Sequence, residues 1–171
     1  MALTSTKKRN ILFILLCFLA YTSSYLLKLS YNANIVCFEA EFGITHAEAG
    51  IVTTFFFFSY GSVQILHGIF VKKYPLRFVI PGAILLGCIL NLLTALSPTF
   101  APIKYYWLLD GAILSILWPS CVRALSENIE EGYRNKAIMV MGLCTAVGTI
   151  LVYLLSALFT AIAHYKIIFY V

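Results

Sequence analysis

The chain has 171 residues, of which 61% are apolar and only 11% are charged, and its mean hydropathy is +0.92. Globular domains contain about 45–50% apolar and about 25% charged residues, so this composition excludes a soluble enzyme, a nucleic-acid-binding protein and a disordered tail. The formal net charge of +5 comes from basic residues that are too few and too scattered to form a basic face for nucleic acid. The composition therefore predicts a membrane protein, with the lipid bilayer as its surroundings.

The apolar residues form five long segments, each of a length that can cross the hydrocarbon core, which takes about 20 residues of helix. They lack the alternating pattern of a β-barrel strand, so we expect an all-α membrane protein, a polytopic helical bundle. The five segments span 10–35, 47–71, 78–97, 104–125 and 136–162. A sixth apolar run starts near 167 and stops with the chain at Val171, which predicts the N-terminal part of a longer protein.

The positions of the basic residues predict the orientation of this bundle. Nine Lys and Arg residues fall on the side of the N-terminus, namely Lys7, Lys8, Arg9, Lys72, Lys73, Arg77, Arg123, Arg134 and Lys136. Two fall on the other side, Lys104 and Lys166. Because cytoplasmic loops are enriched in Lys and Arg, we expect a multi-pass protein of the plasma (cell inner) membrane with a cytoplasmic N-terminus.

The first span carries a polar stripe, which contains Lys28, the one basic residue assigned to neither side of the membrane. The stripe consists of Tyr21, Tyr25, Lys28 and Asn32, whose spacings of four, three and four residues place them on one helix face. A charge at the centre of a bilayer costs about 2.5–3.5 kcal/mol on insertion scales. Lys28 is therefore expected either to face a polar cavity, where it can bind an anion, or to snorkel to the membrane surface.

The second span repeats this pattern with Thr53, Tyr60, Gln64 and His67 on one face. Tyr60 and Gln64 are candidate solute-binding residues, although a glutamine in a membrane helix also bonds to neighbouring helices. For His67, near the end of the span, a hydrogen bond to a loop is favoured over a proton-relay role.

The fourth span contains one acidic residue, Asp110, and the sequence Trp118-Pro119 followed by Arg123. Three roles are open to Asp110: pairing with Lys28, ion coupling as a proton carrier, or a place in a polar vestibule. Pro119 removes one backbone hydrogen bond and is expected to bend the helix. Trp118, Pro119 and Arg123 are predicted to form a cytoplasmic gate or to serve a structural role.

Enzyme chemistry has no support in the sequence, which contains no nucleophile elbow, phosphate loop, paired carboxylates or metal-ligand cluster. The five cysteines are an odd number and form no close pair. We therefore expect no enzyme activity, no catalytic residue, no metal and no cofactor.

Four segments of the chain, taken together, resemble the organophosphate:phosphate antiporter family. The stretch 21–28, YTSSYLLK, is similar to its first-helix signature, and 42–50, FGITHAEAG, to its loop into helix two. Tyr60-Gly61 with Gln64 and Gly68 is similar to its helix-two core, and 117–123, LWPSCVR, to its helix-four Trp-Pro-Pro-Cys-Gly-Arg segment. That family belongs to the major facilitator superfamily and includes glycerol-phosphate and hexose-phosphate exchangers.

The resemblance implies the N-terminal half of a major facilitator fold. This half has five full transmembrane helices plus the start of a sixth, arranged as inverted three-helix repeats, and the C-terminal half is missing from the chain. In the family a basic residue of helix one binds the substrate phosphate, and Lys28 falls on that position. The sequence departs from the family at Gln64, where some members have a second basic residue, and at Thr145, where some phosphate exchangers have histidine.

The function implied is that of a secondary active transporter that moves a small solute by alternating access. An organic anion or a phosphate ester is the expected solute, bound by Lys28, Tyr21, Tyr25, Asn32, Tyr60 and Gln64. One alternative is a proton-coupled carrier of a neutral or carboxylate metabolite. Another is a truncated membrane protein or partner subunit that does not transport.

Overall fold

The computed structural model describes residues 2–170, with side chains from residue 8 onward. Predictions that depend on the side chain of Lys7 or on Val171 lie outside the described residues. Within the described chain the secondary structure is helical, without a β-strand. Five helical segments are long and apolar enough to cross a membrane, namely Lys8–Ala33, His46–Lys73, Leu76–Leu96, Ile103–Asn128 and Glu131–Ile162. The predicted all-α, polytopic membrane fold is therefore confirmed.

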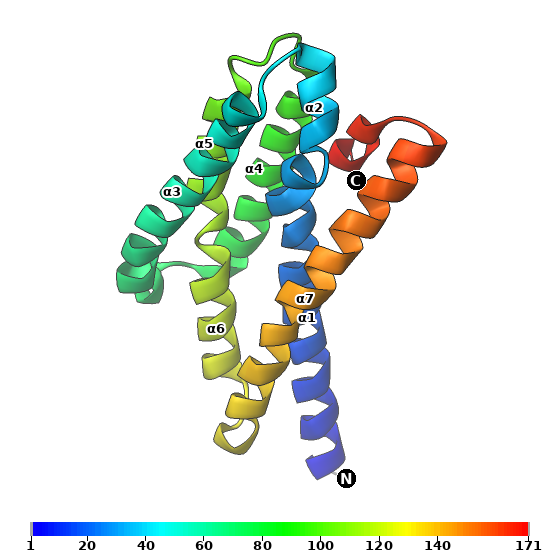
Figure 1. The fold of residues 1–171 in the computed structure, drawn as a ribbon. Coiled ribbons are helices and arrows are strands. Elements are labelled where there is room, and N and C mark those ends of the chain that lie inside the picture. Colours follow the sequence, from blue (N-terminus) through cyan, green and yellow to red (C-terminus); the bar gives the residue numbers. More distant parts are fainter. Residues whose placement is uncertain (1, 171) are drawn as a thin grey trace.

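Two pairs of helices form the body of the bundle (Figure 1). The first span and its extension are α1 (Ala2–Ala33) and α2 (Ile35–Phe42); the second and third are α3 (His46–Phe70), which continues into the 3-10 turn η1 (Val71–Lys73), and α4 (Leu76–Leu96). The fourth consists of α5 (Ile103–Leu114) and α6 (Leu117–Asn128), and the fifth is α7 (Glu131–Ile162), followed by the 3-10 helix η2 (Tyr165–Tyr170). Helix α1 packs along α7, and α3 packs along α5.

The helices of the first and fifth spans extend beyond their predicted apolar ranges, since α2 continues to Phe42 and α7 begins at Glu131. Hydropathy identifies the apolar part of a helix, whereas polar residues at either end can continue the same helix. Where the sequence predicts the start of a sixth membrane helix near 167, the described residues form η2, with Ile168 and Phe169 buried. These six residues pack against α4, α7 and α1.

The connection between the first two spans follows from local sequence. Gly43 ends α2 in the left-handed conformation, with φ of 63°, which glycine adopts without a steric penalty. Thr45 then begins α3 with a capping box: its side chain accepts a hydrogen bond from the backbone of Glu48, whose carboxylate accepts one from the backbone of Thr45. The turn therefore fixes where α3 enters the bundle.

The fourth span is broken at Ser115 and Ile116, between α5 and α6. Pro119 has no backbone N–H, so the carbonyl of Ser115 four residues earlier loses its helical partner. The bend predicted at Pro119 therefore lies one turn before the proline. Helix α5 remains packed on α3 and α4, while α6 contacts α1 and α7.

Close helix contacts and polar side chains hold the spans together. Gly111 of α5 faces the backbone carbonyl of Phe56 in α3, where an added methyl group would collide with it. Ser30 of α1 donates a hydrogen bond to Asn91 of α4 at 2.8 Å, and Asn91 donates to the carbonyl of Leu27 at 3.3 Å. These contacts set the register of α1 against α4 and place the polar stripe of α1 inside the bundle.

Candidate functional site

Lys28 lies inside the bundle and is 5% exposed. Its ammonium nitrogen is buried and has no hydrogen-bond partner among the described residues. The nitrogen lies 4.4 Å from the centre of the Tyr21 ring, 5.0 Å from that of Tyr25 and 5.3 Å from that of Tyr60. These are cation–π distances, at which the ring faces stabilise the positive charge. The side chain therefore does not snorkel to the surface.

The two tyrosines of α1 that surround Lys28, Tyr21 and Tyr25, are fixed by neighbouring helices. The hydroxyl of Tyr25 forms a 2.8 Å hydrogen bond with Thr145 of α7, and its ring lies against Gly148, where a Cβ atom would come within 2.6 Å of Tyr25 Cγ. The ring of Tyr21 packs on that of Trp118 in α6, with 5.1 Å between their centres. Three helices therefore position the aromatic side chains around Lys28.

A small cavity of about 130 Å³ opens beside Lys28, between α1 and α3. It is lined by Tyr25, Lys28, Leu29, Phe56, Phe57 and Tyr60. Ligand pockets measure about 300–1,000 Å³, so this space holds one functional group of a solute. Lys28 is the one charged residue of this lining, and the others are two tyrosines, two phenylalanines and a leucine.

Asp110 is the other buried charge of the bundle core, 1% exposed, and neither carboxylate oxygen has a hydrogen-bond partner among the described residues. Its carboxylate faces α4, where a Cβ atom on Gly87 would lie 3.2 Å from it. The ion pairs found in the described part of the chain do not include Asp110 or Lys28. The two opposite charges are thus buried in the same bundle without a direct bridge.

The two remaining predicted solute-binding residues, Asn32 and Gln64, lie on α1 and α3. The side chain of Asn32 accepts a 2.5 Å hydrogen bond from Thr53, which commits its oxygen to an interhelical contact. Gln64 is half-buried on α3, one turn beyond Tyr60. His67 contacts the hydroxyl of Tyr74 at 3.2 Å and a backbone carbonyl of α5 at 3.4 Å, as the interpretation of a loop-bonded histidine expects.

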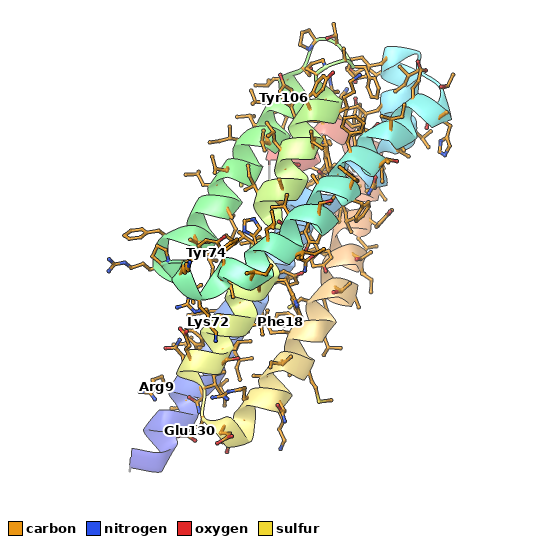
Figure 2. The ribbon with its side chains drawn as sticks, turned by 90° about the vertical axis from the view of Figure 1, so that its left-hand side faces the viewer. Arg9, Phe18, Lys72, Tyr74, Tyr106 and Glu130 are labelled. Atoms are coloured by element: carbon orange, nitrogen blue, oxygen red, sulfur yellow. The ribbon has the colours of Figure 1, made fainter. Side chains whose placement is uncertain are left out.

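Arg123 fastens α6 to the turn between α3 and α4. Its guanidinium donates to the backbone carbonyls of Val71 at 2.5 Å and Tyr74 at 2.8 Å, and to Glu127 at 2.7 Å. Figure 2 shows Tyr74 and Lys72 at this turn, beside α6. Of the two predicted roles, these contacts match the structural one. Trp118 differs from Arg123 because its ring packs on Tyr21 and so contacts the candidate site.

Two asparagines that connect helices around the site were not predicted from the sequence. Asn91 bonds to α1, and Asn34 bonds to Ser156 of α7 at 3.1 Å. The available signal was a lone asparagine within an apolar run, as in the segment around Asn91. Among the described residues, no group of three or more His, Cys, Asp or Glu side chains could hold a metal ion.

The chain is similar to known transport proteins over most of its length. The model of the family described as Major Facilitator Superfamily matches residues 13–171. The chain is 26% identical over 119 residues to a "Probable hexose phosphate transport protein" of Chlamydia trachomatis, a match that covers 69% of this chain and 26% of that protein. It is 26% identical over 149 residues to the "Glucose-6-phosphate exchanger SLC37A2" of Xenopus laevis, covering 79% of this chain and 28% of that protein.

The chain thus spans about a quarter of the length of the curated relatives it matches. A "Probable hexose phosphate transport protein" of Chlamydia pneumoniae is 23% identical over 110 residues, 64% of this chain and 24% of that protein. No solved structure gives a significant match.

Proposed function

The chain belongs to the major facilitator superfamily, and from this premise we propose that it supplies the N-terminal half of a secondary active transporter for an organic anion, with a phosphate ester as the solute class. The predicted membership of the major facilitator superfamily is confirmed. Relatives named for the transport or exchange of sugar phosphates support the solute class. Family membership also makes the chain a multi-pass membrane protein of transport type, not an enzyme.

The observation that carries the proposal is the buried ammonium of Lys28, which has no hydrogen-bond partner in the described chain. A buried charge without a partner is costly, and the rings of the three tyrosines offset only part of that cost. An anionic group in the adjoining cavity would give the ammonium its missing partner. Lysine is a point charge that binds phosphate without the two-pronged geometry of arginine.

The other side chains have supporting roles in this proposal. The tyrosines Tyr21, Tyr25 and Tyr60 would enclose the anionic group, and Gln64 and Asn32 would line the path along the α1–α3 interface. In transporters of this type the solute site lies near the membrane midplane, between two halves that rock against each other. The cavity beside Lys28 would then be one wall of that site.

The test uses the longest reading frame that contains this chain, expressed in cells and assayed for uptake of hexose phosphate. Lys28→Ala should reduce uptake by at least tenfold, while Lys28→Arg should retain part of it because the charge is kept. Lys104→Ala, a half-buried lysine outside the site, is the matched control and should leave uptake unchanged. Undiminished uptake by a membrane-inserted Lys28→Ala protein would reject the anion site, and absence of uptake by the wild type would favour the non-transporting alternative.

A proton-coupled carrier of a neutral or carboxylate metabolite is the second candidate, and Asp110 is the observation that favours it. A carboxylate buried within a membrane helix is a functional candidate because its burial is costly. In proteoliposomes, a requirement for a proton gradient that Asp110→Asn removes would favour this carrier. Exchange that requires phosphate inside the vesicles and survives Asp110→Asn would favour the antiporter.

The orientation belongs to the same proposal: the N-terminus is cytoplasmic, in the plasma (cell inner) membrane. The nine-to-two distribution of Lys and Arg supports it. Single cysteines placed beside Arg9 and beside Lys104 of a cysteine-free variant, labelled in intact cells with an impermeant maleimide, should react only at the second position. The reverse pattern would invert the orientation.

A further inference from the structure

A second hollow lies away from Lys28, between α3, α4 and α5. It measures about 430 Å³ and is lined by apolar side chains, among them Phe78 and Leu86, with His67 as its one polar lining residue. Both ring nitrogens of His67 already contact protein oxygens, those of Tyr74 and Ala112. The hollow therefore offers hydrocarbon contact and no free polar group, so a hydrocarbon chain fits it.

Three basic side chains lie at the end of this hollow, on the turn from α3 to α4. Lys72, Lys73 and Arg77 are exposed, and none of them is in an ion pair among the described residues. The sequence has no acidic residue between Glu48 and Asp110, and Glu127 of α6, which lines a neighbouring hollow with Lys72, is paired with Arg123. The turn thus carries a net positive charge next to an apolar hollow.

Arg77 connects the charge directly to the lining of the hollow. The guanidinium of Arg77 lies 4.7 Å from the ring centre of Phe78, which lines the hollow, and the ammonium of Lys73 lies 5.4 Å from that of Phe70. Arg123 holds the carbonyls on either side of Lys72 and Lys73, so the turn is fixed before any ligand arrives. A ligand that needs both features would not have to order this turn, which favours binding.

We propose that this end of α3 and α4 binds an anionic phospholipid, with the phosphate beside Lys72, Lys73 and Arg77 and one acyl chain in the hollow of α3, α4 and α5. Basic clusters between membrane helices bind anionic headgroups, and the net positive charge favours them over zwitterionic ones. Another apolar hollow of about 430 Å³ lies between α1 and α7. Within the described side chains, no basic group is stacked on its lining, so we assign no lipid to it.

The experiment counts lipids retained by the purified full-length protein in native mass spectrometry, with phosphatidylglycerol and phosphatidylcholine of identical acyl chains supplied in equal amounts. The wild type should retain one phosphatidylglycerol preferentially. Each Lys or Arg near anionic headgroups is worth about a fivefold change in binding, so the triple variant K72Q/K73Q/R77Q should lose the preference by on the order of a hundredfold. The triple variant K8Q/R9Q/K136Q removes the same charge elsewhere and should keep it.

A second pair of variants tests the acyl chain. Gly82 lines the hollow and has open space around it, so Gly82→Phe should fill the hollow and release the lipid. Gly142→Phe, at an equally open glycine of α7, should not. Equal loss in both charge variants, or a lipid retained by Gly82→Phe, would overturn the proposal. Displacement of the lipid from wild-type protein by inorganic phosphate would overturn it as well, because a free anion would then be the occupant; this arm needs no variant to fold.

Discussion

Replacing Gly148 by alanine should disturb the candidate site by displacing Tyr25, without substituting any residue that we propose to contact the solute. An alanine Cβ at this position would lie 2.6, 2.7 and 2.8 Å from Cγ, Cβ and Cδ2 of Tyr25. Two of these atoms are close to the backbone of α1 and not at the end of a flexible side chain. Either the ring must leave its rotamer or α1 must move away from α7, and both weaken the 2.8 Å hydrogen bond from Tyr25 to Thr145.

The size of the effect follows from comparison with a glycine that has free space. Gly142 is on the same helix, and no atom lies within 4 Å of the place that an alanine Cβ would take there. Glycine to alanine in a helix gains about 0.5–1 kcal/mol in backbone entropy, and this gain is common to both variants. Overpacking costs about 1–3 kcal/mol, so Gly148→Ala should be less stable than Gly142→Ala by that amount.

The assay is thermal unfolding in detergent, followed by tryptophan fluorescence, together with hexose phosphate uptake by the membrane-inserted protein. Gly148→Ala should unfold several degrees below Gly142→Ala and should transport less, because a displaced Tyr25 no longer borders the Lys28 cavity. Equal melting temperatures and equal uptake for the two variants would refute the proposed contact between Tyr25 and α7.

Two further predictions concern the ends of the bundle. Arg123→Gln should release the α3–α4 turn, because hydrogen bonds that involve a charged group contribute about 1.5–3 kcal/mol each; faster hydrogen exchange of the η1 amides checks this, and unchanged exchange would contradict it. At the opposite end, Glu41 accepts hydrogen bonds from Tyr165 and from Lys166. Burial by itself raises the pKa of Glu41, but the bonds from Lys166 and Tyr165 outweigh it and hold the pKa below its usual value. A lowered carboxylate pKa stabilises the folded state above the normal carboxylate range and this stabilisation is lost as the pH falls through the lowered pKa. For an ion pair this exposed we expect about 0.2–1 kcal/mol. The loss should be seen as lower protection factors of the η2 amides on acidification, after correction for the intrinsic exchange rate, and Glu41→Gln should show the lower protection at every pH.

The sequence predicted the class of fold and the composition of the site better than its geometry. A run of apolar residues identifies a membrane helix on its own, because the bilayer sets its length. The spacing of Tyr21, Tyr25 and Lys28 likewise fixes a shared helix face, so their proximity follows from the helical period alone. Tyr60 of α3 also lies beside Lys28. The pattern of polar residues in the second span predicted the helix face that carries Tyr60, but not that this face lies against Lys28.

Contacts between helices could not be predicted, because they depend on the rotation and depth of each helix in the bundle. Thr145 bonds to Tyr25 and Trp118 packs on Tyr21, yet nothing in the spacing of α6 or α7 relates them to α1. The oxygen of Asn32 is occupied by Thr53, which the helical wheel of one helix cannot show. The position of Asp110, buried but not bridged to Lys28, is set by the register of α5 against α4 and α1.

The break between α5 and α6 places irregular backbone within a membrane-spanning segment. Hydrocarbon offers no hydrogen bonds, so irregular backbone at membrane depth must be enclosed by protein. In the most apolar 18-residue stretch of the fourth span, 56% of residues are buried, against 22–33% in the other four spans. The carbonyl of Ser115, which Pro119 deprives of its helical partner, thus lies in the span most shielded from lipid.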